Sequence, residues 1–161
     1  MMKRSKRMQP VLELASRKEQ ESLRRCGAAQ QRIDDAQAKL CQLQDYAEDY
    51  RQRGNSAGSV ALDLVQLQAS RHFLERLHDA MRQQQAEVER LQRSATVLRQ
   101  EWMAARRYRD SLADLAERYR HEEHTAHERA AQHRADDLAG QRLAWMRRDD
   151  PAQAAVAGDR S

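Results

Sequence analysis

Apolar residues recur along the first third of the chain at alternating steps of three and four positions. The series runs through Leu12, Ala15, Glu19, Ser22, Cys26, Ala29, Ile33, Ala36, Leu40, Leu43, Ala47 and Tyr50. Ten of these twelve positions are apolar or aromatic, as in the seven-residue repeat of a coiled-coil seam. Because Pro10 suits the first turn of a helix, we predict a helix over residues 10–53 that is weakest near Glu19 and Ser22.

A second series of the same kind follows. It runs through Leu67, Ser70, Leu74, Leu77, Met81, Gln84, Val88, Leu91, Ala95, Leu98, Trp102 and Ala105, and continues through Tyr108, Leu112, Leu115 and Tyr119. Two successive steps of three, which end at Tyr108, predict a stammer that locally overwinds the coiled coil. No Pro interrupts the pattern before Pro151. We therefore predict a helix over residues 60–146 and a disordered tail over residues 149–161.

Glycine, asparagine and serine gather between the two series, in residues 54–59. These residues favour turns, so we predict a loop here, with Ser59 as the N-cap of the second helix. A short loop makes its flanking helices antiparallel. The predicted fold is all-α: an antiparallel two-helix coiled-coil hairpin in one domain, residues 1–148, with a second helix much longer than the first.

The two predicted arms differ in length, about 65 Å against about 130 Å at 1.5 Å per residue. Residues after about Ala105 would then have no partner helix within the chain. Leu112, Leu115 and Tyr119 are expected to lie bare on an isolated hairpin. An apolar stripe of this kind usually binds a partner molecule.

The composition supports helices and argues against a globular core. Aromatic residues make up only 4% of the chain, alanine supplies much of the 40% that is hydrophobic, and charged residues reach 34%. The net charge of +4 comes from interspersed signs, which is typical of solvated helix faces. A basic N-terminal cluster is the exception, and it is suited to an acidic surface: Lys3, Arg4, Lys6 and Arg7.

The pattern contains no candidate for catalysis. His121, His124, His127 and His133 lack the HExxH spacing of a zinc helix, so we expect no metal site, no cofactor and no enzyme activity. Cys26 and Cys41 are expected to be reduced, since about 22 Å of helix separates them. We also expect no nucleic-acid binding, no signal peptide and no membrane span, and hence a cytosolic protein.

Bulky residues beside the seam mark a candidate docking surface near the predicted loop. Tyr46 and Phe73 each stand one position before a seam residue. One interpretation is that these aromatic residues widen the hairpin core. The other is that Tyr46, Tyr50, Phe73 and Leu77 form a patch that binds a partner, since exposed aromatic residues are favoured interface anchors. Trp102 is expected in the core, and Trp145 is either a partner contact or a loosely packed helix end.

The order of these residues resembles the bacterial flagellar export protein family FliJ over roughly residues 8–146. The resemblance lies in Leu12-x-Leu14, Leu43-x-x-Tyr46-x-x-x-Tyr50-Arg51, a Gly/Ser loop, Phe73-Leu74-x-x-Leu77-x-x-Ala80-Met81 and Glu101-Trp102. Lys39 and Gln84 depart from the family pattern, which expects Gln and His there. Injectisome stalk proteins of the YscO type share this architecture.

The resemblance implies a function that periodicity does not show. Members of the family bind inside the hexameric ring of the export ATPase FliI, contact the gate protein FlhA and escort export chaperones. The gate contact is implied for Leu43, Tyr46, Tyr50, Phe73, Leu77 and Ala80. We expect the ATPase contact at Lys3, Arg4, Lys6, Arg7, Leu112, Leu115 and Tyr119.

Three functions are therefore open at this stage. The favoured one is a non-enzymatic stalk and adaptor of the flagellar export apparatus, monomeric in isolation, cytoplasmic and peripheral to the inner membrane. The second is an export chaperone that uses the exposed seam after Ala105. The third is a homodimeric coiled-coil scaffold. A stalk of the injectisome rather than the flagellum is an alternative form of the first.

Overall fold

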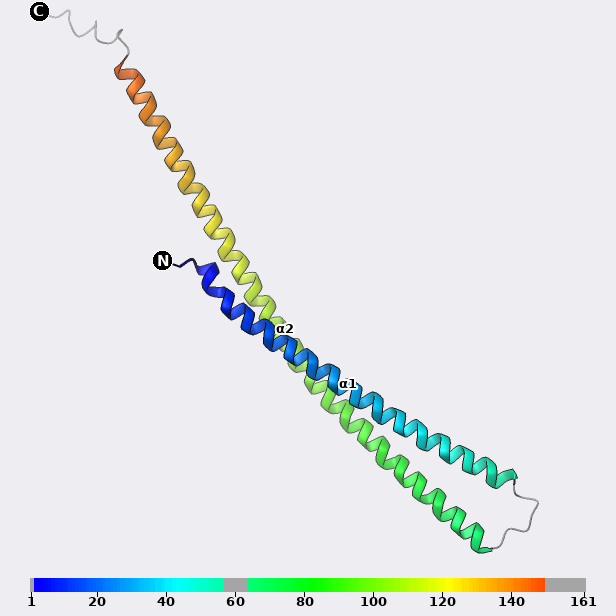
Figure 1. Ribbon diagram of the computed structural model, residues 1–161. Helices are drawn as coiled ribbons and strands as arrows, with labels where there is room; N and C mark the ends of the chain where they lie inside the picture. The colour runs from blue at the N-terminus through cyan, green and yellow to red at the C-terminus, as the bar shows by residue number, and fades with distance from the viewer. Residues whose placement is uncertain (1, 57–63, 150–161) are drawn as a thin grey trace, which may run out of the picture. The chain divides into compact units, whose positions relative to one another are not determined.

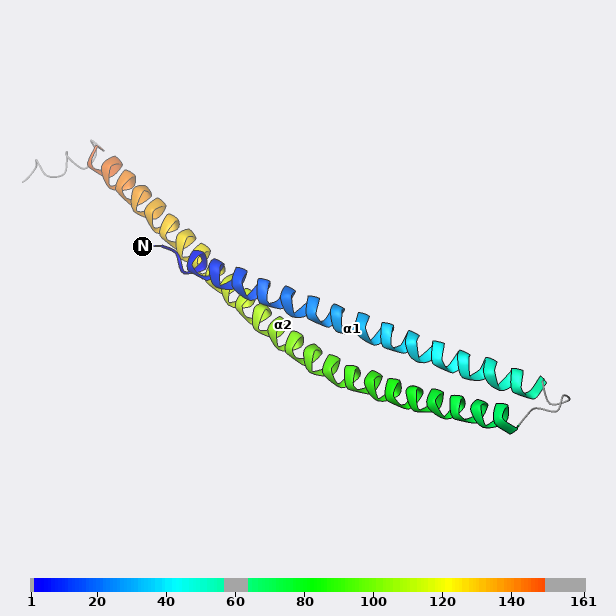
Figure 2. The same ribbon diagram turned by 60° about the horizontal axis from the view of Figure 1, so that its bottom comes forward.

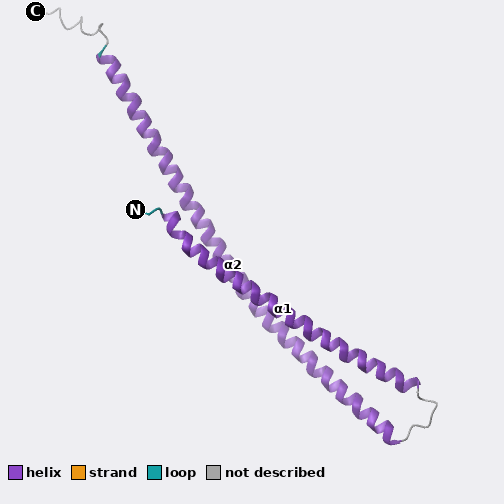
Figure 3. Cartoon of the chain, in the orientation of Figure 1, coloured by secondary structure: helices purple, strands orange, loops and turns teal. Residues whose placement is uncertain are grey.

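The computed structural model describes residues 2–56 and 64–149, and nearly all of them are helical (Figure 3). Helix α1 spans Arg4–Ser56, 53 residues, and helix α2 spans Leu64–Arg148, 85 residues. These two described ranges contain no strand. The chain is an all-α antiparallel two-helix hairpin with a much longer second helix, as predicted (Figure 1).

The chain divides into two compact units, each described by itself below. The first unit, Leu12–Asp110, contains most of α1 and the first part of α2, and we call it the hairpin unit. The second combines Met1–Val11 with Ser111–Ser161, and we call it the terminal unit. The assignment of residues 1–148 to a single domain stays a prediction.

Both ends of α1 differ from the sequence-based expectation. The helix begins at Arg4, so Pro10 lies inside it rather than in its first turn. Pro10 is exposed, and its ring costs the helix one backbone hydrogen bond, to the Lys6 carbonyl. At the other end α1 continues through Gly54 to Ser56, because a glycine weakens a helix by only about 1 kcal/mol and does not by itself end it. The remaining predicted loop residues, Ser59 as N-cap and the tail over residues 150–161 lie outside the described residues.

The seam predicted for α1 is confirmed. All twelve of its positions are buried or half-buried, and the most buried apolar side chains of the hairpin unit are Ala15, Ala29, Ile33, Ala36 and Val88. Three of these five are alanines and the other two are β-branched, so the helices pack closely but bury modest apolar area in each layer. Figure 2 shows α1 and α2 side by side in this unit.

The predicted stammer in α2 is wrong. From Ala105 the seam steps by four to Arg109, which is half-buried, while Tyr108 is 56% exposed. Hydropathy favours tyrosine over arginine at a seam position, but Arg109 forms an ion pair with Glu19 of α1 at 3.2 Å. A charge pair across the helices thus keeps the seven-residue repeat regular where the apolar pattern indicates a break.

The predicted bare seam after Ala105 is also wrong. In the terminal unit Leu112, Leu115 and Tyr119 are half-buried, and Ala116 is only 5% exposed. The reason is the early start of α1, whose first turns pack beside α2 as far as Glu123. Only after Thr125 does every described residue of α2 become exposed.

Candidate partner-binding surfaces

Six residues of the hairpin unit were predicted to contact the export gate, and we call them the aromatic surface: Leu43, Tyr46, Tyr50, Phe73, Leu77 and Ala80. Tyr46 is 66% exposed and Phe73 is 46% exposed, whereas the other four are half-buried. The rings of Tyr50 and Phe73 lie 4.7 Å apart at 45°. The structure thus joins the α1 and α2 parts of this surface through one ring contact.

The two interpretations of these aromatic residues apply to different side chains. Tyr50 belongs to the core, where its hydroxyl makes a 3.1 Å hydrogen bond with Ser70 Oγ. Phe73 widens that core by packing on Tyr50, but nearly half of it stays in solvent. Tyr46 is too exposed to stabilise the core. Exposed aromatic rings held by a packed neighbour are the arrangement that interface anchors require.

A surface depression of about 410 Å³ lies close to the aromatic surface. Its lining includes Tyr50, Leu67 and Leu74 together with Arg51, Arg53 and Arg71. Arg51 also donates a 3.0 Å hydrogen bond to Glu48. This bond, with a second from Gln52, lowers the pKa of the Glu48 carboxyl and keeps it ionised. The depression thus combines an apolar floor with three arginines.

The seven residues predicted to contact the ATPase ring fall into two groups in the terminal unit. The four basic residues Lys3, Arg4, Lys6 and Arg7 are exposed. The three α2 residues lie in the packing beneath α1, and the Arg4 guanidinium stands 6.0 Å from the Tyr119 ring centroid. The basic residues are thus accessible to a partner, whereas the α2 residues hold the segment that carries them.

Glu123 of α2 caps the start of α1. Its carboxylate accepts hydrogen bonds from the Ser5 backbone N–H at 3.0 Å and from the Ser5 hydroxyl at 2.6 Å. The first turn of α1 contains no acidic residue of its own, so Glu123 supplies the negative charge that a helix N-terminus favours. These Ser5 hydrogen bonds, assisted by the charge of Lys3, lower the pKa of Glu123.

The histidine cluster shows no sign of a shared ligand. His121, His124, His127 and His133 are exposed. His124 lies 3.5 Å from Glu128, four residues further on the same helix. Among the described residues no group of three or more His, Cys, Asp or Glu side chains is placed to hold a metal ion. The same residues include no helix long and apolar enough to cross a membrane.

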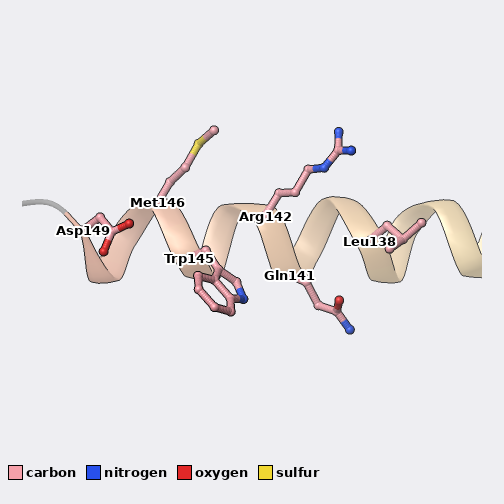
Figure 4. Close-up of a pocket in the computed structure, with 6 residues that line it drawn as sticks. All are labelled: Leu138, Gln141, Arg142, Trp145, Met146 and Asp149. Atoms are coloured by element: carbon pink, nitrogen blue, oxygen red, sulfur yellow. The ribbon is translucent and has the colours of Figure 1, made fainter.

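The last part of α2 carries large exposed apolar side chains. Between Thr125 and Asp149 these are Leu138, Leu143, Trp145 and Met146. Figure 4 shows Trp145 and Met146 on different sides of the helix, with Arg142 one turn before Met146. Trp145 is 72% exposed, which excludes a role in the packing of the terminal unit. This exposure agrees with both interpretations of Trp145, as a partner contact and as a loosely packed helix end.

Sequence reasoning missed a polar layer in the hairpin unit, in which the buried Glu19 meets the half-buried Trp102 and Arg109. Glu19 is only 7% exposed. Its carboxylate accepts a 2.9 Å hydrogen bond from Trp102 Nε1 and one of 3.2 Å from Arg109. Arg109 also binds Asp110, which raises the pKa of its guanidinium. The sequence did contain a signal for this layer. Glu19 is a carboxylate at a seam position of α1, and Trp102 and Arg109 lie seven residues apart on α2.

Comparisons with known proteins agree with the family resemblance. The family model described as Flagellar FliJ protein matches residues 4–148, which is nearly the whole described chain. No curated protein and no solved structure matches the chain. The matched range includes the aromatic surface, the polar layer and the Ser5–Glu123 contact. A match over this length shows that the chain belongs to the FliJ family of flagellar proteins and is a component of the flagellar export apparatus.

Proposed function

We propose that this protein is a non-enzymatic stalk and adaptor that binds the hexamer of the export ATPase FliI and the export gate protein FlhA. Family membership supports a place in the export apparatus. The observation that carries the adaptor role is the separation of two accessible surfaces into different compact units. The aromatic surface belongs to the hairpin unit, and the exposed basic residues belong to the terminal unit.

The aromatic surface is proposed to bind the gate. Tyr46 and Phe73 supply exposed rings, and the half-buried Tyr50 packs against the ring of Phe73. Packing restricts the motion of Phe73, so binding loses little side-chain entropy there. We expect peripheral association with the inner membrane to follow from this contact.

The terminal unit is proposed to enter the ATPase ring. Lys3, Arg4, Lys6 and Arg7 offer four exposed cations to an acidic lining, and the stretch of α2 after Thr125 offers large exposed apolar side chains. In this proposal Leu112, Leu115 and Tyr119 support the basic segment by packing rather than by touching the ring. No chemistry is assigned to the chain, because its part is to position two partners.

The chaperone alternative loses the surface on which it depended. It required an exposed seam after Ala105, but α1 covers that seam in the terminal unit as far as Glu123. We therefore keep the chaperone-escort role only as an addition to the adaptor function. The dimeric scaffold would need a free seam in the hairpin unit, where α1 and α2 already fill each other's seam. We expect sedimentation of the isolated chain to give a monomer.

Binding assays with purified partners test the division of labour. Tyr46→Ala/Phe73→Ala is expected to weaken gate binding at least about tenfold, the loss typical of an interface anchor, and to leave ATPase binding unchanged. A chain that ends at Thr125 is expected to show the reverse pattern. The matched control is Val97→Ala/Met103→Ala, which removes two other exposed apolar side chains of α2. Equal losses for both partners in both variants would contradict the proposal.

A further inference from the structure

Glu19, in the polar layer, differs from the other buried residues of the described chain because its side chain is charged. The buried side chains are apolar apart from Glu19. The partners of Glu19, Trp102 Nε1 and Arg109, come from α2, and both stand at seam positions seven residues apart. The carboxylate therefore lies between two donors that belong to successive repeats of the same helix.

The apolar seam near this layer does not distinguish one alignment of the helices from another. On α1 the neighbouring seam residues are small: Ala15, Ser22, Cys26 and Ala29. A slip of one seven-residue repeat would place similar small residues against α2 again. Such a slip moves a helix by about 10 Å. Residues 57–63 connect the helices, and seven residues reach about 23–25 Å when fully extended, so the length of the connection does not forbid the slip.

Slipped alignments differ from the observed one in the hydrogen-bond partners that lie opposite Glu19. One slip would place Glu19 between Ala95 and Trp102, without the guanidinium. The opposite slip would keep Arg109 but lose the indole. In either case a buried carboxylate would give up one of its two partners, and an incompletely paired buried charge is costly.

We propose that the layer of Glu19, Trp102 and Arg109 sets the alignment of α1 against α2, as a single buried polar residue does in coiled coils that select one register. The other polar bonds across the hairpin unit depend on the same alignment. These are Gln84 Nε2 to the Ala36 carbonyl at 2.8 Å and Tyr50 with Ser70. Both are less buried than Glu19, which makes the polar layer the main determinant.

The test measures the distance between spin labels on the full-length chain. Native Cys26 and Cys41 are replaced by alanine and serine, and label cysteines are introduced at the exposed positions Arg24 and Gln83. Gln83 precedes Gln84, which contacts Ala36, so the two sites are separated along the helix axes. A slip of one repeat then changes the distance between the labels by up to about 10 Å.

Glu19→Leu/Arg109→Leu is the informative variant, because it replaces the charge pair with apolar side chains. We expect the single distance of the parent chain to be joined by a second one, displaced by up to about 10 Å. The matched control is Glu21→Leu/Arg25→Leu, an exposed pair within α1, which should keep one unchanged distance. One unchanged distance in the informative variant overturns the proposal, and so does a second distance in the control.

A heptad-shifted variant decides the case if the informative variant loses its helical circular dichroism. Glu19→Ala/Cys26→Glu, with glutamate at position 26 in place of the alanine of the labelled chain, moves the carboxylate by seven residues along α1. If the polar layer sets the alignment, the shifted carboxylate will bind Trp102 and Arg109 and the label distance will change by up to about 10 Å. A heptad-shifted chain that keeps only the parent distance contradicts the proposal.

Discussion

Two parts of the hairpin unit are stabilised in different ways. Toward the ends of α1 and α2 that flank residues 57–63, both helices contribute large or branched seam residues, among them Ile33 and Leu40 from α1 and Leu74, Leu77 and Val88 from α2. Around Glu19 the bulk comes from α2 alone, and the carboxylate is held by two polar contacts. Apolar burial supplies stability in the first part, whereas specific hydrogen bonds supply alignment in the second.

The largest effect is expected from Ile33→Ala, in the apolar part. Ile33 is 6% exposed, so its truncation removes buried methyl groups and leaves a cavity between the helices. We expect the free energy of unfolding to fall by about 2–4 kcal/mol, measured by chemical denaturation followed by circular dichroism. Val97→Ala, at an exposed position, is the control and should change it by less than about 0.5 kcal/mol. Similar losses in both variants would show that the seam is not where the stability resides.

Glu19→Ala comes second and tests the polar part. The substitution removes the acceptor of Trp102 Nε1 and one acceptor of Arg109, and leaves those donors to find water. We expect a loss of about 1–3 kcal/mol in the free energy of unfolding. Glu21→Ala is the matched control, because Glu21 pairs with Arg25 on the surface of the same helix and such pairs contribute little. If Glu19→Ala were as harmless as its control, the polar layer would not contribute to stability.

The same contrast explains how much of the fold the sequence predicts. Apolar periodicity gave the helical hairpin and every seam position of α1, because burial follows side-chain hydropathy. It failed at Tyr108 and Arg109, where a cross-helix ion pair outweighs hydropathy. It also failed at the start of α1, since the pattern of one helix does not show that Glu123 of another will cap it.

For the candidate binding surfaces, the sequence predicted which aromatic residues are exposed but not which side chains contact one another. Tyr46 and Phe73 stand outside the seam in the sequence, and both are exposed in the structure. The contact between Tyr50 and Phe73 depends on the alignment of two helices, which the apolar pattern alone does not specify. Leu112, Leu115 and Tyr119 were assigned to an exposed stripe because the expected first helix was six residues too short at its start.

A smaller effect is expected from Glu123, which extends the comparison to a polar contact of the terminal unit. Its pKa is lowered from the ordinary value of 4.5, because the Ser5 hydrogen bonds favour the ionised form. Glu123 therefore stabilises the folded chain above the unfolded pKa, and this contribution is lost as the pH falls through the lower folded value. We expect Glu123→Gln to reduce hydrogen-exchange protection in the first turn of α1 more at pH 7 than at pH 3.

Glu122→Gln is the control for that measurement, since it changes the neighbouring exposed carboxyl. It should leave protection of the first turn of α1 unchanged at both pH values. A loss of protection that is the same at pH 7 and pH 3 in Glu123→Gln would mean that the amide geometry, and not the charge, caps the helix.

The smallest effect on stability is expected from Trp145→Ala. Trp145 is 72% exposed on a stretch of α2 that has no described neighbour helix, so its truncation removes little buried surface. We expect the free energy of unfolding to change by less than about 0.5 kcal/mol. The matched substitution is Trp102→Ala, which removes a half-buried indole and its hydrogen bond from the polar layer and should cost about 1–3 kcal/mol. If Trp145→Ala and Trp102→Ala destabilised the chain equally, Trp145 would have to pack within the isolated chain. If instead Trp145→Ala leaves stability unchanged and weakens ATPase binding, the ring contact lies on this part of α2.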